Sequence, residues 1–137
     1  MKVTAFIDKE NFHEKQKNGK EIGLDFGIKT SITTSEGEKI DVSIGESDRV
    51  KRLQRKMSRQ IKGSNNRRKT INLLRREYLK ISNRKKDKAN KIVSKLKSYN
   101  CIVIQDEQIA SWQKGLFGKQ VQHSCLGLVK AKLKSLP

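Results

Sequence analysis

Residues 21–30 read E-I-G-L-D-F-G-I-K-T, an apolar run with a single carboxylate, Asp25, at its centre. Alternate side chains of an extended strand point to opposite faces, so Ile22, Leu24 and Phe26 share one face and Asp25 lies on the other. A carboxylate in such a strand is costly to bury unless it pairs with a cation or binds a metal. The segment therefore fits either a hairpin strand with one half-exposed aspartate or a strand that carries a functional site.

Three more strands are predicted around this one. Lys29–Thr34 is rich in β-branched residues, residues 35–37 form a turn, and Lys39–Ile44 alternates apolar and polar side chains. Further on, Cys101–Ile104 is a continuous apolar run, typical of a strand buried on both faces in a parallel sheet, and Cys101 itself fits a small buried hydrophobe. The sequence predicts an α/β fold in which three antiparallel strands are followed by a parallel strand.

The 137 residues carry a formal net charge of +18, and that charge is concentrated in one segment. Residues 49–97 hold 20 lysines and arginines against only Glu77 and Asp87, whereas the rest of the chain holds 12 basic and 12 acidic side chains. A charge of this size indicates a polyanionic partner. Nucleic acid is favoured over a membrane because no apolar amphipathic anchor accompanies the charge.

Apolar residues in this basic segment recur at the spacing of helices. The first helix is predicted to begin after an N-cap at Ser47 or Asp48. Its thin apolar stripe consists of Val50, Leu53, Met57 and Ile61. A turn at residues 62–66 ends this helix, and a second helix is predicted from near Arg67 towards Ser98. Its apolar stripe consists of Leu74, Tyr78, Ile81, Ala89, Ile92 and Leu96. The segment is therefore predicted to be a helical hairpin with an apolar seam and cationic outer faces.

The turn of this hairpin is the predicted centre of phosphate binding, because cations flank it on both sides. The predicted contacts are Arg52, Lys56, Arg59, Lys62, Ser64, Asn65, Asn66, Arg67, Arg68 and Lys69. Aromatic side chains for base stacking are scarce, so binding should depend on the nucleic-acid backbone and weaken steeply with salt. An ordinary solvated surface is the alternative, but such surfaces usually mix charges of both signs.

Gln105-Asp106-Glu107 follows the predicted strand at Cys101–Ile104. If this strand lies parallel to and beside the first, Asp25 and Glu107 approach one another at the carboxyl ends of the strands. Asp106 points to the opposite face and is the weaker candidate. Two such carboxylates would form an oxygen-ligand site for Mg²⁺ or Mn²⁺, which can activate water and stabilise the leaving oxygen of a phosphodiester.

Five segments of the chain, in the right order, resemble the central part of TnpB (OrfB-type) proteins, which insertion sequences encode and which are often labelled transposases. They are I-G-L-D-F-G-I-K-T, R-L-Q-R-K-M-S-R-Q-I-K-G-S-N-N-R-R-K, I-S-N-R-K-K-D, N-K-I-V-S-K-L and C-I-V-I-Q-D-E. The resemblance covers residues 20–137. It implies a RuvC-type, RNase H-like endonuclease that is guided by RNA, cuts DNA with a divalent metal and takes part in transposition and DNA recombination. Asp25 matches the first catalytic aspartate of that family.

Two departures from the family pattern shape the expectation. Gln105 stands where the usual I-E-D motif has its glutamate, and Glu107, two residues on, points the same way and can replace it. The family's third acidic residue lies beyond a zinc-binding segment with two C-x-x-C pairs, which these 137 residues do not contain. We therefore expect a truncated protein that is inactive alone and has no zinc site, with the missing parts of the full-length protein as partners.

The expected organisation follows from these segments. Residues 1–19 are predicted to be a tail or the remnant of a preceding domain, and residues 20–137 an incomplete RuvC-like domain, with residues 49–97 inserted as the basic hairpin. No signal peptide or membrane span is visible. The two cysteines form no C-x-x-C pair, which favours a reducing, cytoplasmic setting without a membrane partner.

The C-terminal segment is predicted to cover the sheet. From Gln120 onward an amphipathic helix is indicated by Val121, Cys125, Leu128, Val129, Lys132 and Leu133. Trp112, Leu116 and Phe117 would need cover, as a lid over the sheet or as a partner surface. Weaker candidates for nucleic-acid contacts are Gln113, Lys114, Lys119 and Gln122.

Two functional alternatives to the nuclease stay open. In the first, the chain is a non-catalytic nucleic-acid-binding module that acts through the basic hairpin alone. In the second, it is the product of a decayed reading frame without a selected function. Metal dependence separates the nuclease from the binding module, since a nuclease needs Mg²⁺ or Mn²⁺ for turnover and a binding module needs only low salt.

Overall fold

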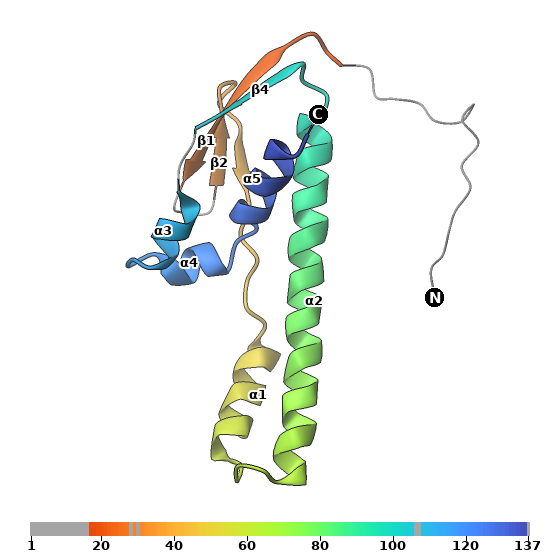
Figure 1. The fold of residues 1–137 in the computed structure, drawn as a ribbon, viewed down its shortest axis with the longest axis vertical. Helices are drawn as coiled ribbons and strands as arrows, with labels where there is room; N and C mark the ends of the chain where they lie inside the picture. Colours follow the sequence, from red (N-terminus) through yellow and green to blue (C-terminus); the bar gives the residue numbers. More distant parts are fainter. Residues whose placement is uncertain (1–16, 28, 30, 106–107, 137) are drawn as a thin grey trace, which may run out of the picture.

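The computed structural model describes residues 17–27, 29, 31–105 and 108–136 (Figure 1). Within them, three strands precede two helices, a fourth strand and three short helices. The elements are β1 Glu21–Gly27, β2 Ser31–Thr34, β3 Lys39–Asp41, α1 Asp48–Arg59, α2 Asn65–Leu96, β4 Cys101–Ile104, α3 Ile109–Gln113, α4 Gly118–Gln122 and α5 Leu126–Lys134. The segment before residue 17, with its expected tail, lies outside the described residues.

The strands form one mixed sheet in the order β3-β2-β1-β4. β1 pairs antiparallel with β2, with Asp25 opposite Thr33, and β2 pairs antiparallel with β3. β1 also pairs in parallel with β4, with Leu24 opposite Ile104. The predicted α/β fold, with three antiparallel strands and then a parallel strand, is confirmed, although β2 and β3 are shorter than expected.

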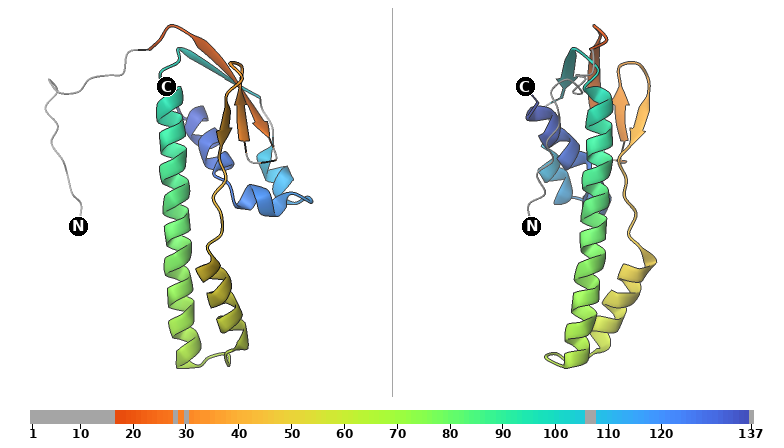
Figure 2. Two further views of the ribbon diagram at one scale, coloured as in Figure 1. Left: turned by 180° about the vertical axis from the view of Figure 1, so that it is seen from behind. Right: turned by 90° about the vertical axis from the view of Figure 1, so that its right-hand side faces the viewer.

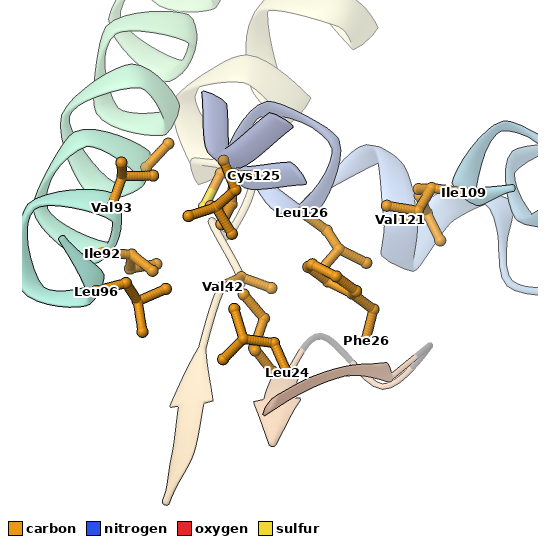
Figure 3. Close-up of a cluster of buried hydrophobic side chains, with 14 of the residues drawn as sticks. Leu24, Phe26, Val42, Ile92, Val93, Leu96, Ile109, Val121, Cys125 and Leu126 are labelled. Carbon is orange, nitrogen blue, oxygen red and sulfur yellow. The ribbon is translucent and has the colours of Figure 1, made fainter. Parts of the chain in front are cut away.

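One face of β1 points into the hydrophobic core. Ile22, Leu24 and Phe26 are at most 4% exposed, whereas Asp25 is exposed on the opposite face, as the alternation predicts. Helices α2 and α5 cover the buried face, and Figure 3 shows their side chains directed at the strands. The helices supply Ala89, Ile92, Val93, Leu96, Leu126, Val129 and Leu133 to this core.

The second face of the sheet has no covering element among the described residues, and this overturns two expectations for β4. Val103 is 59% exposed and Cys101 is also exposed. The prediction of a strand buried on both faces, with Cys101 as a buried hydrophobe, is therefore wrong. Ile102 and Ile104 are half-buried against the core, because β4 lies at the sheet's edge and its alternate side chains point to solvent.

Helix α2 serves two parts of the molecule. Its C-terminal half packs on the sheet, and its N-terminal half lies against α1 to form a hairpin that extends away from the sheet (Figures 1 and 2). The predicted helical hairpin is confirmed, but two members of its apolar stripes are exposed. Ile61, 81% exposed, lies beyond the end of α1, and Tyr78 is 45% exposed at the edge of the seam.

The single helix predicted from Gln120 onward is two helices, α4 and α5, with a break at residues 123–125. Cys125 N–H donates a hydrogen bond to Val42 O at 2.9 Å, and Ser124 forms an isolated β-bridge with Ser43. This pairing takes the chain out of helical geometry. Most of the predicted apolar positions are nevertheless buried, with Leu128, 37% exposed, as the exception.

A charged pair fastens β3 to α2. Lys88 Nζ donates hydrogen bonds to Asp41 Oδ2 and to Ser43 O, both at 2.8 Å. The hydrogen bond from Lys88, followed by those from the hydroxyl and the N–H of Ser43, lowers the pKa of Asp41 from 3.8 to about 2. The carboxylate thus stays ionised well into acid.

Asp41 is expected to make the protein more sensitive to acid between about pH 4 and pH 2. Its pKa is lower in the folded state, so its contribution to stability is complete above the unfolded pKa of 3.8 and is lost as the pH falls towards 2. Asp41→Asn should make the free energy of unfolding, measured in urea, depend less on pH in this range. Asp48→Asn, which removes a carboxylate 3.9 Å from Lys51, is the control, and equal slopes for the two variants would contradict the assignment.

Candidate nucleic-acid interface and metal-binding carboxylate

Two serine caps and a glycine shape the hairpin. Ser47 caps α1 by accepting a hydrogen bond from Val50 N–H at 3.3 Å, which confirms the predicted cap. Ser64 caps α2 in the same way, accepting from Arg67 N–H at 3.2 Å. Gly63 between them has φ +85°, in the left-handed region where a side chain is strained. These three residues therefore determine where the two helices begin and how the chain turns between them.

Arg67 holds this turn closed. Its Nη1 donates hydrogen bonds to Met57 O at 2.8 Å and to Gln60 O at 3.1 Å, and so satisfies carbonyls at the C-terminal end of α1. With the Ser64 hydroxyl occupied as a cap, two of the predicted phosphate contacts serve the hairpin itself. Sequence spacing shows the charge of Arg67 but not this tertiary role.

Arg67→Ala is expected to lower the free energy of unfolding by about 1–2 kcal/mol, because it leaves helix-end carbonyls without their charged donor. The neighbouring Arg68 is exposed and its side chain has no partner in the described part of the chain. Arg68→Ala should therefore change stability by about 0.5 kcal/mol or less. Urea unfolding of both variants tests this, and equal losses would contradict the capping role of Arg67.

The cations of residues 49–97 divide into paired and unpaired groups. Close to the sheet several of them have partners: besides Lys88, Lys95 pairs with Glu38, and Lys85 donates to Gln122 O. These contacts fasten α2 to β3, to the turn before it and to the end of α4. Such cations serve the fold and are less available to a ligand.

Midway along α2, Glu77 holds the two hairpin helices together. It is 8% exposed and forms ion pairs with Arg49 at 3.4 Å and with Lys80 at 2.9 Å. The hydrogen bond from Lys80, followed by the positive charges of Lys80, Arg49 and Arg84, lowers the pKa of this carboxyl group below its usual 4.5. One of the two acidic residues of the basic segment is thus internal to the hairpin.

The cations further along α1 have no partner in the part of the chain that the structure describes. Arg52, Lys56 and Arg59, all predicted as phosphate contacts, are exposed and have no hydrogen bond or ion pair within the described ranges. Arg55 joins them and was missed, although it stands three and four residues from its neighbours, where helical side chains meet. These four residues, the hairpin patch, line a hollow of about 450 Å³ together with Gln60.

The predicted contacts around the turn are placed next to this patch in sequence. Lys62, Asn65, Asn66, Arg68 and Lys69 are all exposed. They lie in the turn and in the first residues of α2, where N–H groups not used inside the helix favour anions. The structure therefore leaves most of the predicted phosphate contacts accessible to a ligand.

Asp25 lies at the carboxyl end of β1 on the open face of the sheet. The pairing with β4 extends to Leu24 and Ile104, so Gln105, which is exposed, follows directly at the level of Asp25. The neighbouring parallel strands expected from the sequence are confirmed. Asp106 and Glu107 lie outside the described residues, and their approach to Asp25 stays a prediction.

The Asp25 carboxylate fits a hard cation as one ligand. It is exposed and has no hydrogen-bond or ion-pair partner in the described part of the chain. Carboxylate oxygens are the ligands that Mg²⁺ and Mn²⁺ prefer. The described residues contain no group of three His, Cys, Asp or Glu side chains arranged around a metal, so further ligands would have to come from residues such as 106 and 107.

Within the described residues, neither cysteine belongs to a group of possible metal ligands with Asp25. Cys101 is exposed on β4, whereas Cys125 is buried in the core, where burial raises the pKa of its thiol.

Among the described helices, none is both long and apolar enough to span a bilayer.

Comparison with known proteins bears on both sites. The sequence pattern of the OrfB_IS605 family, described as "Probable transposase", matches residues 4–112. The chain is also 31% identical over 101 residues to "Putative RNA-guided DNA endonuclease InsQ" of Escherichia coli (strain K12). That alignment covers 71% of this chain and 25% of InsQ, so the chain spans about a quarter of the length of this curated relative. Asp25 and the hairpin patch both lie within the part that matches the family.

Proposed function

Because the chain belongs to the OrfB_IS605 family of transposases, we propose that it binds nucleic acid on its helical hairpin and contributes Asp25 to an endonuclease site. The TnpB-type identity predicted from the sequence is confirmed by the family match and by the likeness to InsQ. The observation that carries the proposal is the hairpin patch, four neighbouring cations without a partner in the described residues. Unpaired cations on one helix face attract the phosphates of a nucleic acid.

The order of the strands supports an RNase H-like, RuvC-type core. Three antiparallel strands are followed by a fourth that lies parallel to the first. Asp25, to which the resemblance to TnpB proteins assigns the first catalytic role, is on the first strand. The open face of the sheet leaves the Asp25 carboxylate accessible to substrate.

Asp25, with Glu107 or Asp106, is the proposed binding site of Mg²⁺ or Mn²⁺. When bound, such a cation would lower the pKa of an attacking water and stabilise the leaving oxygen of the phosphodiester. The chain's own part is to hold Asp25 on a rigid central strand, with Gln105 beside it on β4. A site placed on paired strands is positioned more precisely than one on loops.

The proposed partners are DNA and an RNA guide, in line with the name of InsQ, "Putative RNA-guided DNA endonuclease". The hairpin offers many cations and few aromatic side chains, so it would contact phosphates rather than read bases. We also propose that residues 1–137 alone bind nucleic acid without cutting it, because two carboxylates such as Asp25 and Glu107, without a third, would bind the metal weakly.

Fluorescence anisotropy with labelled DNA and RNA over a range of KCl concentrations tests the binding proposal. The logarithm of the association constant should fall with the logarithm of salt with a slope of about −3 or steeper, since four or more phosphates are neutralised. Binding should persist in EDTA. A shallow slope, or no binding at low salt, would refute the proposal.

The non-catalytic binding module is the second candidate, and the exposed cations of the hairpin patch, which need no metal to bind phosphates, favour it. Incision of a supercoiled plasmid, with Mg²⁺, Mn²⁺ or EDTA, distinguishes the two candidates. Metal-dependent incision by this chain that Asp25→Ala removes would establish the nuclease and contradict the proposed inactivity of the isolated chain. If the metal neither binds nor supports incision, the binding module remains.

A further inference from the structure

The connection between α3 and α4 projects from the body of the protein, away from α2 (Figures 1 and 2). It carries the sequence K-G-L-F-G-K at residues 114–119. Leu116 at its end is 99% exposed and Phe117 is 43% exposed. A leucine this exposed beside an aromatic ring forms an apolar tip without cover among the described residues.

Close packing and a backbone hydrogen bond fix the base of this tip. A Cβ atom on Gly118 would come within 2.3 Å of Gln113 O, so only glycine permits this close return of the chain. Gly118 N–H donates a hydrogen bond to Gly115 O at 3.0 Å. On either side, Ile109 and Val121 are buried, and they anchor α3 and α4 in the core. The apolar tip is thus presented by a turn with fixed ends.

Cations flank the tip. Lys114 and Lys119 are exposed on either side of it, and neither has a side-chain partner among the described residues. Lys119 also lines a hollow of about 400 Å³ together with His123 and with Lys51 from α1. Glu46 is the acidic residue in this lining. The hollow joins the base of the tip to the start of the hairpin, where Lys51 pairs with Asp48 at 3.9 Å.

We propose that Leu116 and Phe117 form a wedge that contacts exposed base faces of a nucleic acid whose phosphates lie on the hairpin patch, Lys114 and Lys119. Apolar side chains that are flanked by cations insert between base steps or stack on unpaired bases in nucleic-acid-binding proteins. The flanking positive charge favours a polyanion over a second protein surface. This inference rests on the proposed nucleic-acid binding and assigns the apolar tip a separate part in it.

A DNA with one unpaired 2-aminopurine in an otherwise paired duplex reports contact with a base. At saturating wild-type protein the fluorescence of the probe should change, and Leu116→Ala should remove at least half of that change. The loss of affinity caused by Leu116→Ala should be about tenfold larger for this DNA than for the fully paired duplex. Leu79→Ala is the matched control, because Leu79 is 61% exposed on α2 and loses the same side chain away from the tip.

The outcomes separate the inference from the proposed function. If the wild-type protein binds with a steep salt dependence but Leu116→Ala and Leu79→Ala give the same probe signal, the wedge is refuted and nucleic-acid binding stands. If no protein binds either DNA at low salt, the proposed function itself fails. Sedimentation that shows self-association of the free protein, lost in Leu116→Ala with an unchanged probe signal, would reassign the tip to contact between copies.

Discussion

Replacing all four residues of the hairpin patch with glutamine is expected to weaken nucleic-acid binding on the order of a thousandfold at about 0.1 M salt. Each phosphate contact releases about 0.9 of a counterion, so the loss of four contacts should also reduce the salt slope by between about 3 and 4. The substitutions are Arg52→Gln, Arg55→Gln, Lys56→Gln and Arg59→Gln. Fluorescence anisotropy over a range of KCl concentrations measures both quantities.

A second variant with the same net charge separates position from total charge. Lys17→Gln, Lys20→Gln, Lys97→Gln and Lys132→Gln remove four cations that lie outside the hairpin patch and have no side-chain partner among the described residues. This variant should lose no more than about one unit of slope. Equal losses in the two variants would mean that the net charge of +18, not the patch, determines binding.

Asp25→Ala is expected to weaken Mn²⁺ binding at the carboxyl ends of β1 and β4 at least tenfold, because even the loss of a residue that only supports a ligand costs about 10–100-fold. In the wild-type protein, Mn²⁺ should broaden the amide NMR signals of residues near Asp25, such as Thr33 and Gln105. The variant should lose this broadening, and any cleavage, but keep its affinity for nucleic acid. The exposed carboxylate has no partner among the described residues, so the fold should be unaffected.

Glu21→Ala provides the control for this experiment. Glu21 lies on the same face of β1 as Asp25 but at the opposite end of the strand, and it is also exposed. Its removal should leave the Mn²⁺ effect in place. Broadening that survives Asp25→Ala, or a loss of nucleic-acid binding in that variant, would refute the role assigned to Asp25.

The features that local spacing determines could be predicted from the sequence. The alternation of Ile22, Leu24 and Phe26 around Asp25 gives the buried and open faces of β1, because side chains of a strand alternate whatever surrounds them. The helices of the hairpin follow in the same way from a period near four and, for the first of them, from the cap at Ser47. These rules hold within a few residues along the chain.

The features that depend on distant parts of the chain could not be predicted. An apolar run such as Cys101–Ile104 does not show whether one face or two will be covered, so the exposure of Val103 was missed. The break between α4 and α5 comes from pairing with Val42 and Ser43, about eighty residues earlier in the chain. Likewise, Arg67 looks like its neighbours in the sequence until its hydrogen bonds to the end of α1 are seen.

The continuity of α2 gives the molecule a fixed internal scale. One helix of 32 residues, about 48 Å long, begins at the turn of the hairpin and ends in the core beneath the sheet. Each residue inserted into or removed from it would shift the hairpin by about 1.5 Å and rotate it by about 100° relative to Asp25. Only changes close to whole turns would keep a bound phosphate backbone facing the same way. The length of this helix therefore sets both the distance and the relative orientation between the proposed nucleic-acid-binding surface and Asp25.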